Sequence, residues 1–187
     1  MLKPLFACLA LAALPSAALS QQASAPGEWK VSGSQSGCIV HTTLSQGTVV
    51  SVLAGTGQES LLFLIQNRGW QSLEDGSRHE LAVQLDGGSE FEFDAVAKTE
   101  LDSDGPGLMF AVPPGEPDGA RFIAEFAKAG GMAVGQDGEA IASLRLTGGG
   151  SAMIGLAQCM SQLWSSGATA QQTKQRAKIG PGTAIKL

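Results

Sequence analysis

Two histidines are the side chains of this sequence best suited to acid–base chemistry. His41 and His79 are the only ones among 187 residues. A serine-hydrolase triad would need one of them between a serine and an oriented carboxylate. His41 follows Ile39 in a strand-like alternation, and His79 stands in a charged turn between Arg78 and Glu80. Neither context supplies a specific partner, so the sequence predicts no catalytic histidine.

The short motifs of common enzyme classes are missing as well. The sequence contains no GxSxG, HExxH, Walker or SxxK pattern. Residues 33–37 look like a nucleophile elbow, but Gln35 stands where the serine must be. Glu90 and Glu92 are two residues apart, so on a strand both would lie on the same outer face. Carboxylates there keep the sheet hydrated rather than act as acid and base. We therefore expect no catalytic residue, no metal-ligand set and no cofactor.

The N-terminal residues have the pattern of a secretory signal peptide. Lys3 is the only charge in the first 20 residues, and an apolar run follows over residues 5–14. Pro15 comes next, and residues 18–20 read Ala-Leu-Ser, a small-x-small cleavage pattern. The apolar run falls well short of the ~20 residues that a bilayer span needs. The sequence thus predicts removal of residues 1–20, a periplasmic or secreted location, and a mature protein without a transmembrane span.

Two cysteines, Cys38 and Cys159, remain in the predicted mature chain. An even number of cysteines in an exported protein favours a disulfide over a metal site. The close spacing of zinc ligands is also absent. In the chain-entropy model, a bridge that closes most of a domain of this size stabilises it by roughly 4–5 kcal/mol. The sequence therefore predicts an intramolecular disulfide between these two residues.

Arg68 and Trp70 form the one candidate ligand platform in the sequence. They stand two residues apart in the segment 67–73, which reads as a strand, so both side chains would lie on one face. A guanidinium beside an indole ring offers cation–π contacts of the kind that small-ligand and glycan sites use. The alternative is that Trp70 is a core residue at a sheet edge.

Charge is distributed unevenly along the predicted mature chain. Residues 21–163 hold 7 basic and 17 acidic residues, whereas four basic residues and no acidic one follow Trp164. An acidic body repels phosphate backbones, so we expect no nucleic-acid partner. Residues 165–187 lack an apolar face, and the sequence predicts a flexible basic tail that is solvated or touches an anionic surface.

Short apolar segments alternate with glycine-rich turns over residues 21–164, which is typical of an antiparallel β-domain. Residues 61–65 are apolar at every position, as expected of a central strand covered on both faces. Residues 81–85 and 91–97 alternate with period two on either side of an Asp-Gly-Gly turn, which predicts a hairpin. The pattern predicts a single β-rich domain of about eight or nine strands.

Two amphipathic segments interrupt the strands and predict helices. Asp118 is the expected N-cap of a helix over residues 119–129, and Ser151 is that of a second helix. On the second helix, apolar residues form a stripe that has Cys159 at its edge: Met153, Leu156, Met160, Leu163 and Trp164. The predicted fold class is mainly β, a β-sandwich or half-closed antiparallel barrel, with two α-helices packed on it.

The order of several short motifs resembles that of small exported β-domain proteins of α-proteobacteria. These motifs are Trp29, Gly37-Cys38, the segment Asn67–Gly76, and the strand Ala142–Gly148 followed by an alanine-containing helix that ends at Cys159. The closing strand and helix are also similar to those of the invasion-associated locus B family of periplasmic β-proteins. The resemblance implies a periplasmic location and a β-fold, and it implies no reaction.

Export, a compact β-fold, an acidic surface and the lack of catalytic motifs favour one function class above the others. They predict a non-catalytic periplasmic binding or envelope-interaction domain, whose partner is an envelope protein or a small ligand. Two alternatives stay open. One is a hydrolase with an unrecognised site, and the other is an inhibitor or immunity-type protein that caps another enzyme.

Overall fold

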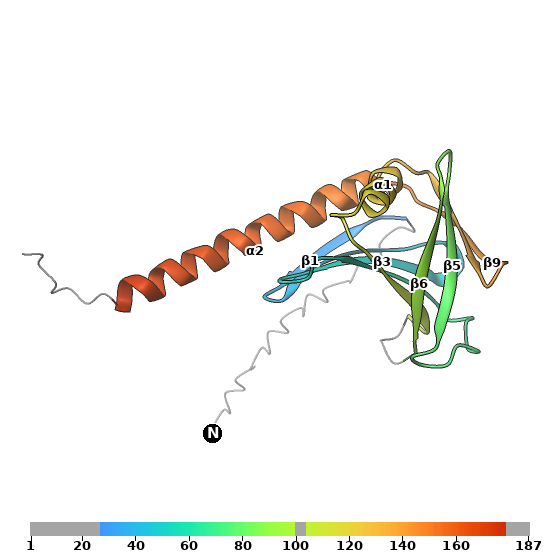
Figure 1. Ribbon diagram of the computed structural model, residues 1–187, viewed down its shortest axis with the longest axis horizontal. Coiled ribbons are helices and arrows are strands. Elements are labelled where there is room, and N and C mark those ends of the chain that lie inside the picture. Colours follow the sequence, from blue (N-terminus) through green and yellow to red (C-terminus); the bar gives the residue numbers. More distant parts are fainter. Residues whose placement is uncertain (1–26, 100–103, 179–187) are drawn as a thin grey trace, which may run out of the picture.

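The computed structural model describes residues 27–99 and 104–178; the side chains of Gln46 and of residues 167–178 are not described. The predicted signal peptide, residues 1–20, lies outside these ranges. Figure 1 shows a bent sheet with two helices, α1 and α2, on the same side of its first strands.

Nine strands form one continuous antiparallel sheet in the order β1-β2-β3-β4-β7-β6-β5-β8-β9. In chain order they are β1 (Lys30–Ser34), β2 (Gly37–Thr43), β3 (Thr48–Gly55), β4 (Leu61–Asn67), β5 (Arg78–Leu85), β6 (Glu90–Lys98), β7 (Gly107–Val112), β8 (Gly131–Gln136) and β9 (Glu139–Arg145). The predicted class, mainly β with two helices, is confirmed. One sheet carries every described strand and does not close into a barrel, so the fold is a single open sheet rather than the two stacked sheets of a β-sandwich.

The hairpin of β5 and β6 forms as its alternation predicts. Leu81 pairs with Phe93 and Val83 with Phe91, so the apolar side chains of both strands lie on one face. Gly87, in the connecting turn, has φ of +70°, a left-handed conformation that glycine adopts without strain. The opposite face of the hairpin carries carboxylates and faces solvent.

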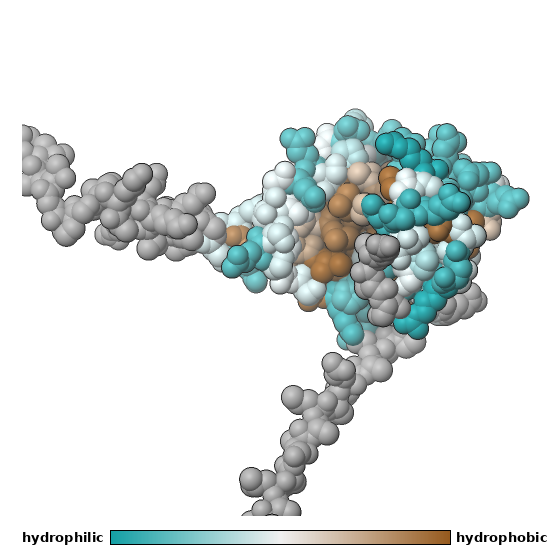
Figure 2. Space-filling model, turned by 90° about the horizontal axis from the view of Figure 1, so that it is seen from below, coloured by the Kyte–Doolittle hydropathy of each residue, from teal (hydrophilic) through white to brown (hydrophobic). Residues whose placement is uncertain are grey.

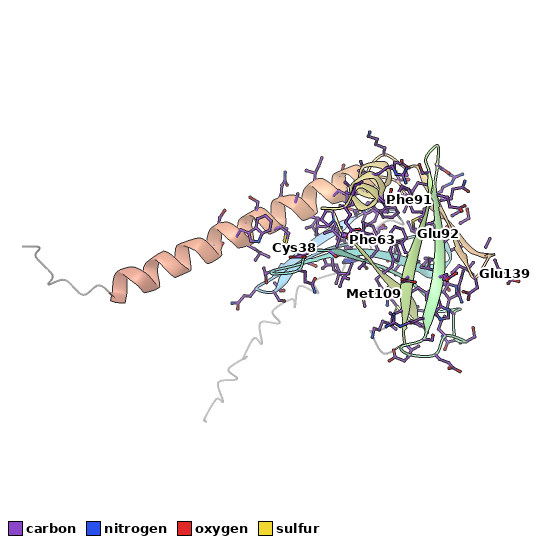
Figure 3. The ribbon with its side chains drawn as sticks, in the orientation of Figure 1. Cys38, Phe63, Phe91, Glu92, Met109 and Glu139 are labelled. Atoms are coloured by element: carbon purple, nitrogen blue, oxygen red, sulfur yellow. A yellow bond between two sulfur atoms is a disulfide. The ribbon has the colours of Figure 1, made fainter. Side chains whose placement is uncertain are left out.

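A cluster of phenylalanines fills the inside of the bend. Phe63 on β4 lies 5.2 Å from the rings of both Phe122 and Phe126, measured between centroids, and Phe91 on β6 lies 5.1 Å from Phe122. These pairs are edge-to-face, the arrangement that aromatic quadrupoles favour. Figure 3 shows Phe63 and Phe91 in the space between the strands and α1. The two halves of the sheet therefore share one core, which α1 closes.

The first helix, α1 (Pro117–Phe126), begins earlier than predicted. Its N-cap is Glu116, so the predicted cap at Asp118 is wrong. Pro117 occupies the first turn, where its fixed φ suits a helix and its missing N–H is not needed. Asp118 lies inside that turn instead, and its carboxylate accepts a hydrogen bond of 3.0 Å from Arg121.

The second helix, α2 (Gly149–Lys178), differs from the prediction at both ends. Ser151 lies inside the helix rather than at its cap. A Cβ on Gly149 would stand 2.9 Å from the carbonyl oxygen of Phe126, so the glycines there let α2 start against the end of α1. At the other end the backbone of residues 165–178 is helical, whereas a loose tail was predicted from residue 165.

The longer α2 has a simple physical reason in its composition. Nine of the 14 residues 165–178 are alanine, glutamine, lysine or arginine, which are good helix formers. Among the described helices, none is long and apolar enough to cross a membrane.

A disulfide and a short apolar contact hold α2 on the sheet. Cys38 of β2 and Cys159 of α2 are bonded, with their Cα atoms 6.1 Å apart, which confirms the predicted pairing. Of the predicted stripe, Leu156 and Met160 are buried against the sheet together with Ala152, Met153 and Leu163 are half-buried, and Trp164 is exposed. Gly33 of β1 lies against the bridge, because a Cβ there would stand 2.8 Å from the Sγ of Cys159.

We expect Thr42→Val to raise the free energy of unfolding by about 1 kcal/mol, because it removes a buried hydroxyl that makes no hydrogen bond. Thr42 is 1% exposed, and its Oγ1 has no partner in the described part of the chain. Chemical denaturation of both proteins measures the change.

Thr48→Val is the matched control for that substitution. Thr48 is also buried, but its Oγ1 accepts a hydrogen bond of 2.7 Å from Asn67, so the same change should lower stability. Equal effects of the two substitutions would contradict the assignment of Thr42 as the unsatisfied group.

Candidate binding cleft

The predicted ligand platform does not lie on a strand. β4 ends at Asn67, and both Arg68 and Trp70 fall in the loop before β5. Arg68 stands 3.9 Å from the carboxylate of Asp104, and Trp70 is half-buried against the main core. The strand placement that aligned these two side chains is therefore wrong, while a ligand role for them stays a prediction.

His79 stands at the centre of a hydrogen-bond chain that contains a serine and an aspartate. Its Nε2 lies 2.7 Å from the Oγ of Ser77, and its Nδ1 lies 3.0 Å from the Nε2 of Gln136 and 3.7 Å from the carboxylate of Asp137. Gln136 also donates to Asp137 at 3.3 Å, and Ser77 donates to the carbonyl of Glu74 at 2.7 Å. The residue types are those of a hydrolase triad.

The direction of these hydrogen bonds argues against catalysis. With the amide of Gln136 donating to both Nδ1 and Asp137, His79 carries its proton on Nε2 and donates it to Ser77. The hydroxyl of Ser77 then points its own proton at a backbone carbonyl. A general base must accept from its nucleophile, so this chain ties a loop to β5 and β8 instead.

The remaining chemical candidates are not brought together. His41 is half-buried on the face of the sheet opposite to that of His79, and it pairs across strands with Ser51. Glu90 and Glu92 lie on the exposed face of β6, as the sequence predicted. In the described residues, no group of three or more His, Cys, Asp or Glu side chains could hold a metal ion.

An acidic hollow of about 500 Å³ lies over that exposed face of β5 and β6. Its carboxylates are Glu80, Glu90, Glu92, Asp94 and Asp137. Glu80 and Asp94 stand directly opposite each other across the two strands, a like-charge pairing that costs stability. These exposed carboxylates keep this face of the sheet hydrated.

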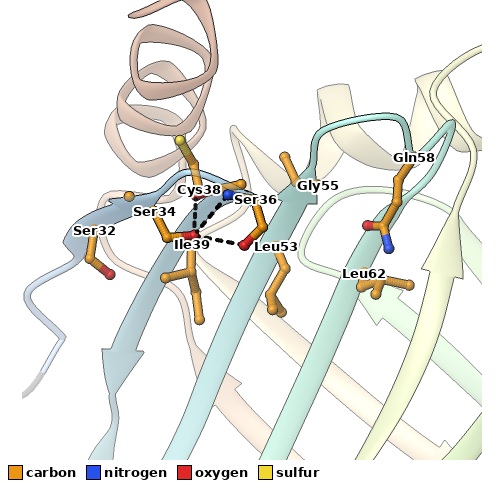
Figure 4. A pocket seen from close by; sticks show the side chains of 12 residues that line it. Ser32, Ser34, Ser36, Cys38, Ile39, Leu53, Gly55, Gln58 and Leu62 are labelled. Atoms are coloured by element: carbon orange, nitrogen blue, oxygen red, sulfur yellow. Dashed lines mark hydrogen bonds between the residues drawn. The ribbon is translucent and has the colours of Figure 1, made fainter. Parts of the chain in front are cut away.

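A second hollow, the sheet depression, lies on the face turned away from the helices. It has a volume of about 410 Å³ and is floored by Ile39, Leu53 and Leu62. Figure 2 shows apolar side chains gathered in the middle of this face. In Figure 4 these three side chains point away from α2, whereas Cys38 points toward it. Strands of one sheet form the floor, so the depression is shallow and has no opposing wall.

A third hollow, the helix cleft, has walls on two sides. One wall is α2, and the other is the turn between β3 and β4 together with Pro114. Its volume is about 290 Å³, and most of its lining is apolar: Leu61, Pro114, Met153, Leu156, Met160 and Trp164. Leu156 and Met160 are also part of the core, so the floor of the cleft is the edge of the core itself.

Trp164 stands at this cleft with its side chain largely in solvent. Its exposed fraction is 65%, although the sequence placed it on the buried stripe of the helix. Eight residues separate it from the buried Leu156, a rotation of about 80° around the helix axis. That rotation carries the indole from the face on the sheet to the flank beside the β3–β4 turn, where it lines the cleft.

The sequence missed this cleft because its walls come from distant segments. Residues 54–61, Pro114 and α2 meet only after the disulfide and the sheet have placed them. The one local signal was a tryptophan followed by two serines at the end of an apolar stripe.

Comparisons of the chain with models of protein families, with curated proteins and with solved structures give no match. The function must therefore be argued from the residues themselves.

We expect Ser77 not to react with a fluorophosphonate, because its hydroxyl proton is held by the carbonyl of Glu74. Ser77→Ala should still lower the free energy of unfolding by about 1 kcal/mol, since the Nε2 of His79 loses its acceptor. Intact-mass spectrometry after labelling measures the reaction. Ser143→Ala, at an exposed serine of β9, controls for the loss of a hydroxyl. Stoichiometric labelling that only Ser77→Ala abolishes would establish a nucleophile.

Proposed function

We propose that the protein is a non-catalytic, exported binding domain that holds an apolar group of its partner in the helix cleft. The observation that carries the proposal is the cleft itself: a concave, largely apolar hollow with an exposed tryptophan at its mouth. Ligand sites are typically hollows of this kind, lined by apolar and aromatic side chains with a few polar groups.

The lining of the cleft favours binding over simple packing. Met153 and Met160 have flexible, polarisable side chains that adapt to ligands of different shape. Tryptophan and methionine are also enriched at the centres of protein interfaces. An indole that is 65% exposed on the flank of the helix would gain from being covered by a partner.

The proposed location is the periplasm or the extracellular space. The predicted signal peptide and the Cys38–Cys159 disulfide support export, because disulfides persist in oxidising compartments. The resemblance to exported β-domain proteins of α-proteobacteria supports the same location. An envelope protein is therefore a suitable partner, and an enzyme that this domain caps would use the same cleft.

N-Phenyl-1-naphthylamine, an uncharged apolar fluorophore, should bind the protein saturably and lose about tenfold in affinity in Trp164→Ala. Tenfold corresponds to ~1.4 kcal/mol, a modest share of what a buried indole contributes to a contact. Fluorescence titration measures both affinities, and thermal unfolding verifies that the variant is folded.

Ile154→Ala is the control, because Ile154 is 61% exposed on the same helix and does not line the cleft. The proposal would be overturned by the absence of saturable binding. It would also be overturned if Ile154→Ala weakened binding as much as Trp164→Ala.

A further inference from the structure

One charged residue, Glu59, lines the helix cleft. It is exposed on the turn between β3 and β4, across from the wall that α2 forms. The other polar side chains in the lining, Gln58 and Ser60, are neutral. A ligand that fills the cleft therefore meets one carboxylate at its edge.

The opposite wall brings no positive charge to Glu59. From Gly149 to Ser166, α2 contains no charged residue at all. No salt bridge within the described part of the chain involves Glu59. The surrounding body adds to its field, because residues 21–163 hold 7 basic and 17 acidic residues. The mouth of the cleft is thus both apolar and negative.

Trp164 offers a second attraction for a cation at the same mouth. The face of an indole ring attracts lysine and arginine, and the aliphatic stems of these side chains pack on apolar surface. A positive charge beside an apolar anchor would meet the carboxylate of Glu59 and the ring of Trp164 from opposite walls. An anionic group there would be repelled.

We propose that the occupant of the helix cleft is a cationic amphipathic segment of a partner protein. An apolar side chain of that segment fills the cleft between Met160 and Leu61, and an adjoining lysine or arginine lies at Glu59. This inference rests on the proposed function and adds the charge of the partner. A second copy of the acidic body does not have the required charge.

Three acetylated peptides test the inference; they share a Leu-Leu-Gly-Leu segment and end in two lysines, two glutamines or two glutamates. Quenching or shift of the Trp164 fluorescence reports binding, with Trp164→Phe as the blank for the other tryptophans. The lysine peptide should bind about fivefold more tightly than the glutamine peptide, and the glutamate peptide most weakly. Raising the ionic strength should shrink these differences.

Glu59→Gln should remove most of the preference for lysine over glutamine, leaving only the smaller share from Trp164 and the acidic body, and should leave the affinity for the glutamine peptide unchanged. Glu139→Gln is the matched control, because it removes the same charge from an exposed strand end that does not line the cleft. If Glu139→Gln reduced the preference for lysine equally, that preference would come from the net charge of the protein. The role of Glu59 would then be overturned.

The remaining outcomes also decide between the two proposals. Equal affinity of the three peptides, with binding of N-phenyl-1-naphthylamine retained, would overturn the cationic partner while the apolar cleft stands. Loss of binding of the fluorophore as well as the peptides would overturn the proposed function. Dimerisation that depends on the basic residues 174–186 and blocks peptide binding would assign the cleft to the chain's own basic end, against a foreign partner.

Discussion

The Cys38–Cys159 disulfide joins β2, next to the N-terminal edge of the sheet, to the last helix, and it holds in place the helix that forms one wall of the helix cleft. Beneath α2, the apolar contact is limited to Ala152, Leu156 and Met160 with half-buried neighbours. Full burial of two large side chains contributes roughly 3–6 kcal/mol. The bridge adds a comparable amount by restricting the unfolded chain, on the order of 4–5 kcal/mol. The wall of the cleft is thus held by two contributions of similar size.

The phenylalanine core and α1 fix the parts of the structure that the disulfide joins. The phenylalanine cluster fixes α1 inside the bend of the sheet, and the end of α1 supports the first turn of α2 through Gly149. The same sheet presents carboxylates on β5 and β6 and a neutral apolar face on β2, β3 and β4. The cleft lies where the turn between β3 and β4 meets α2, so its apolar lining stands within an acidic molecule. A ligand could therefore be held in the helix cleft by apolar contacts and by charge attraction at the same time.

Features with a local cause could be predicted from the sequence. Period-two alternation placed Leu81, Val83 and Phe91 on one face, and the number of cysteines predicted the disulfide. Features set by tertiary contacts could not. The start of α2 depends on a close approach to Phe126 that no local pattern records. Trp164 matched the spacing of the buried stripe, and only the position of α2 on β2 decides which flank of the helix stays open.

Hydrogen exchange of α2 before and after reduction of the disulfide tests most directly whether the bridge holds the wall of the cleft. On reduction, the backbone amides of residues 152–163 should lose about tenfold or more in protection from exchange. The reason is that α2 can then open locally without also opening β2, to which the disulfide joins it. The amides of β4 and β7, in the centre of the sheet, should stay protected. Unchanged protection in α2 would show that packing alone holds the helix, and would contradict the dependence of the cleft on the disulfide.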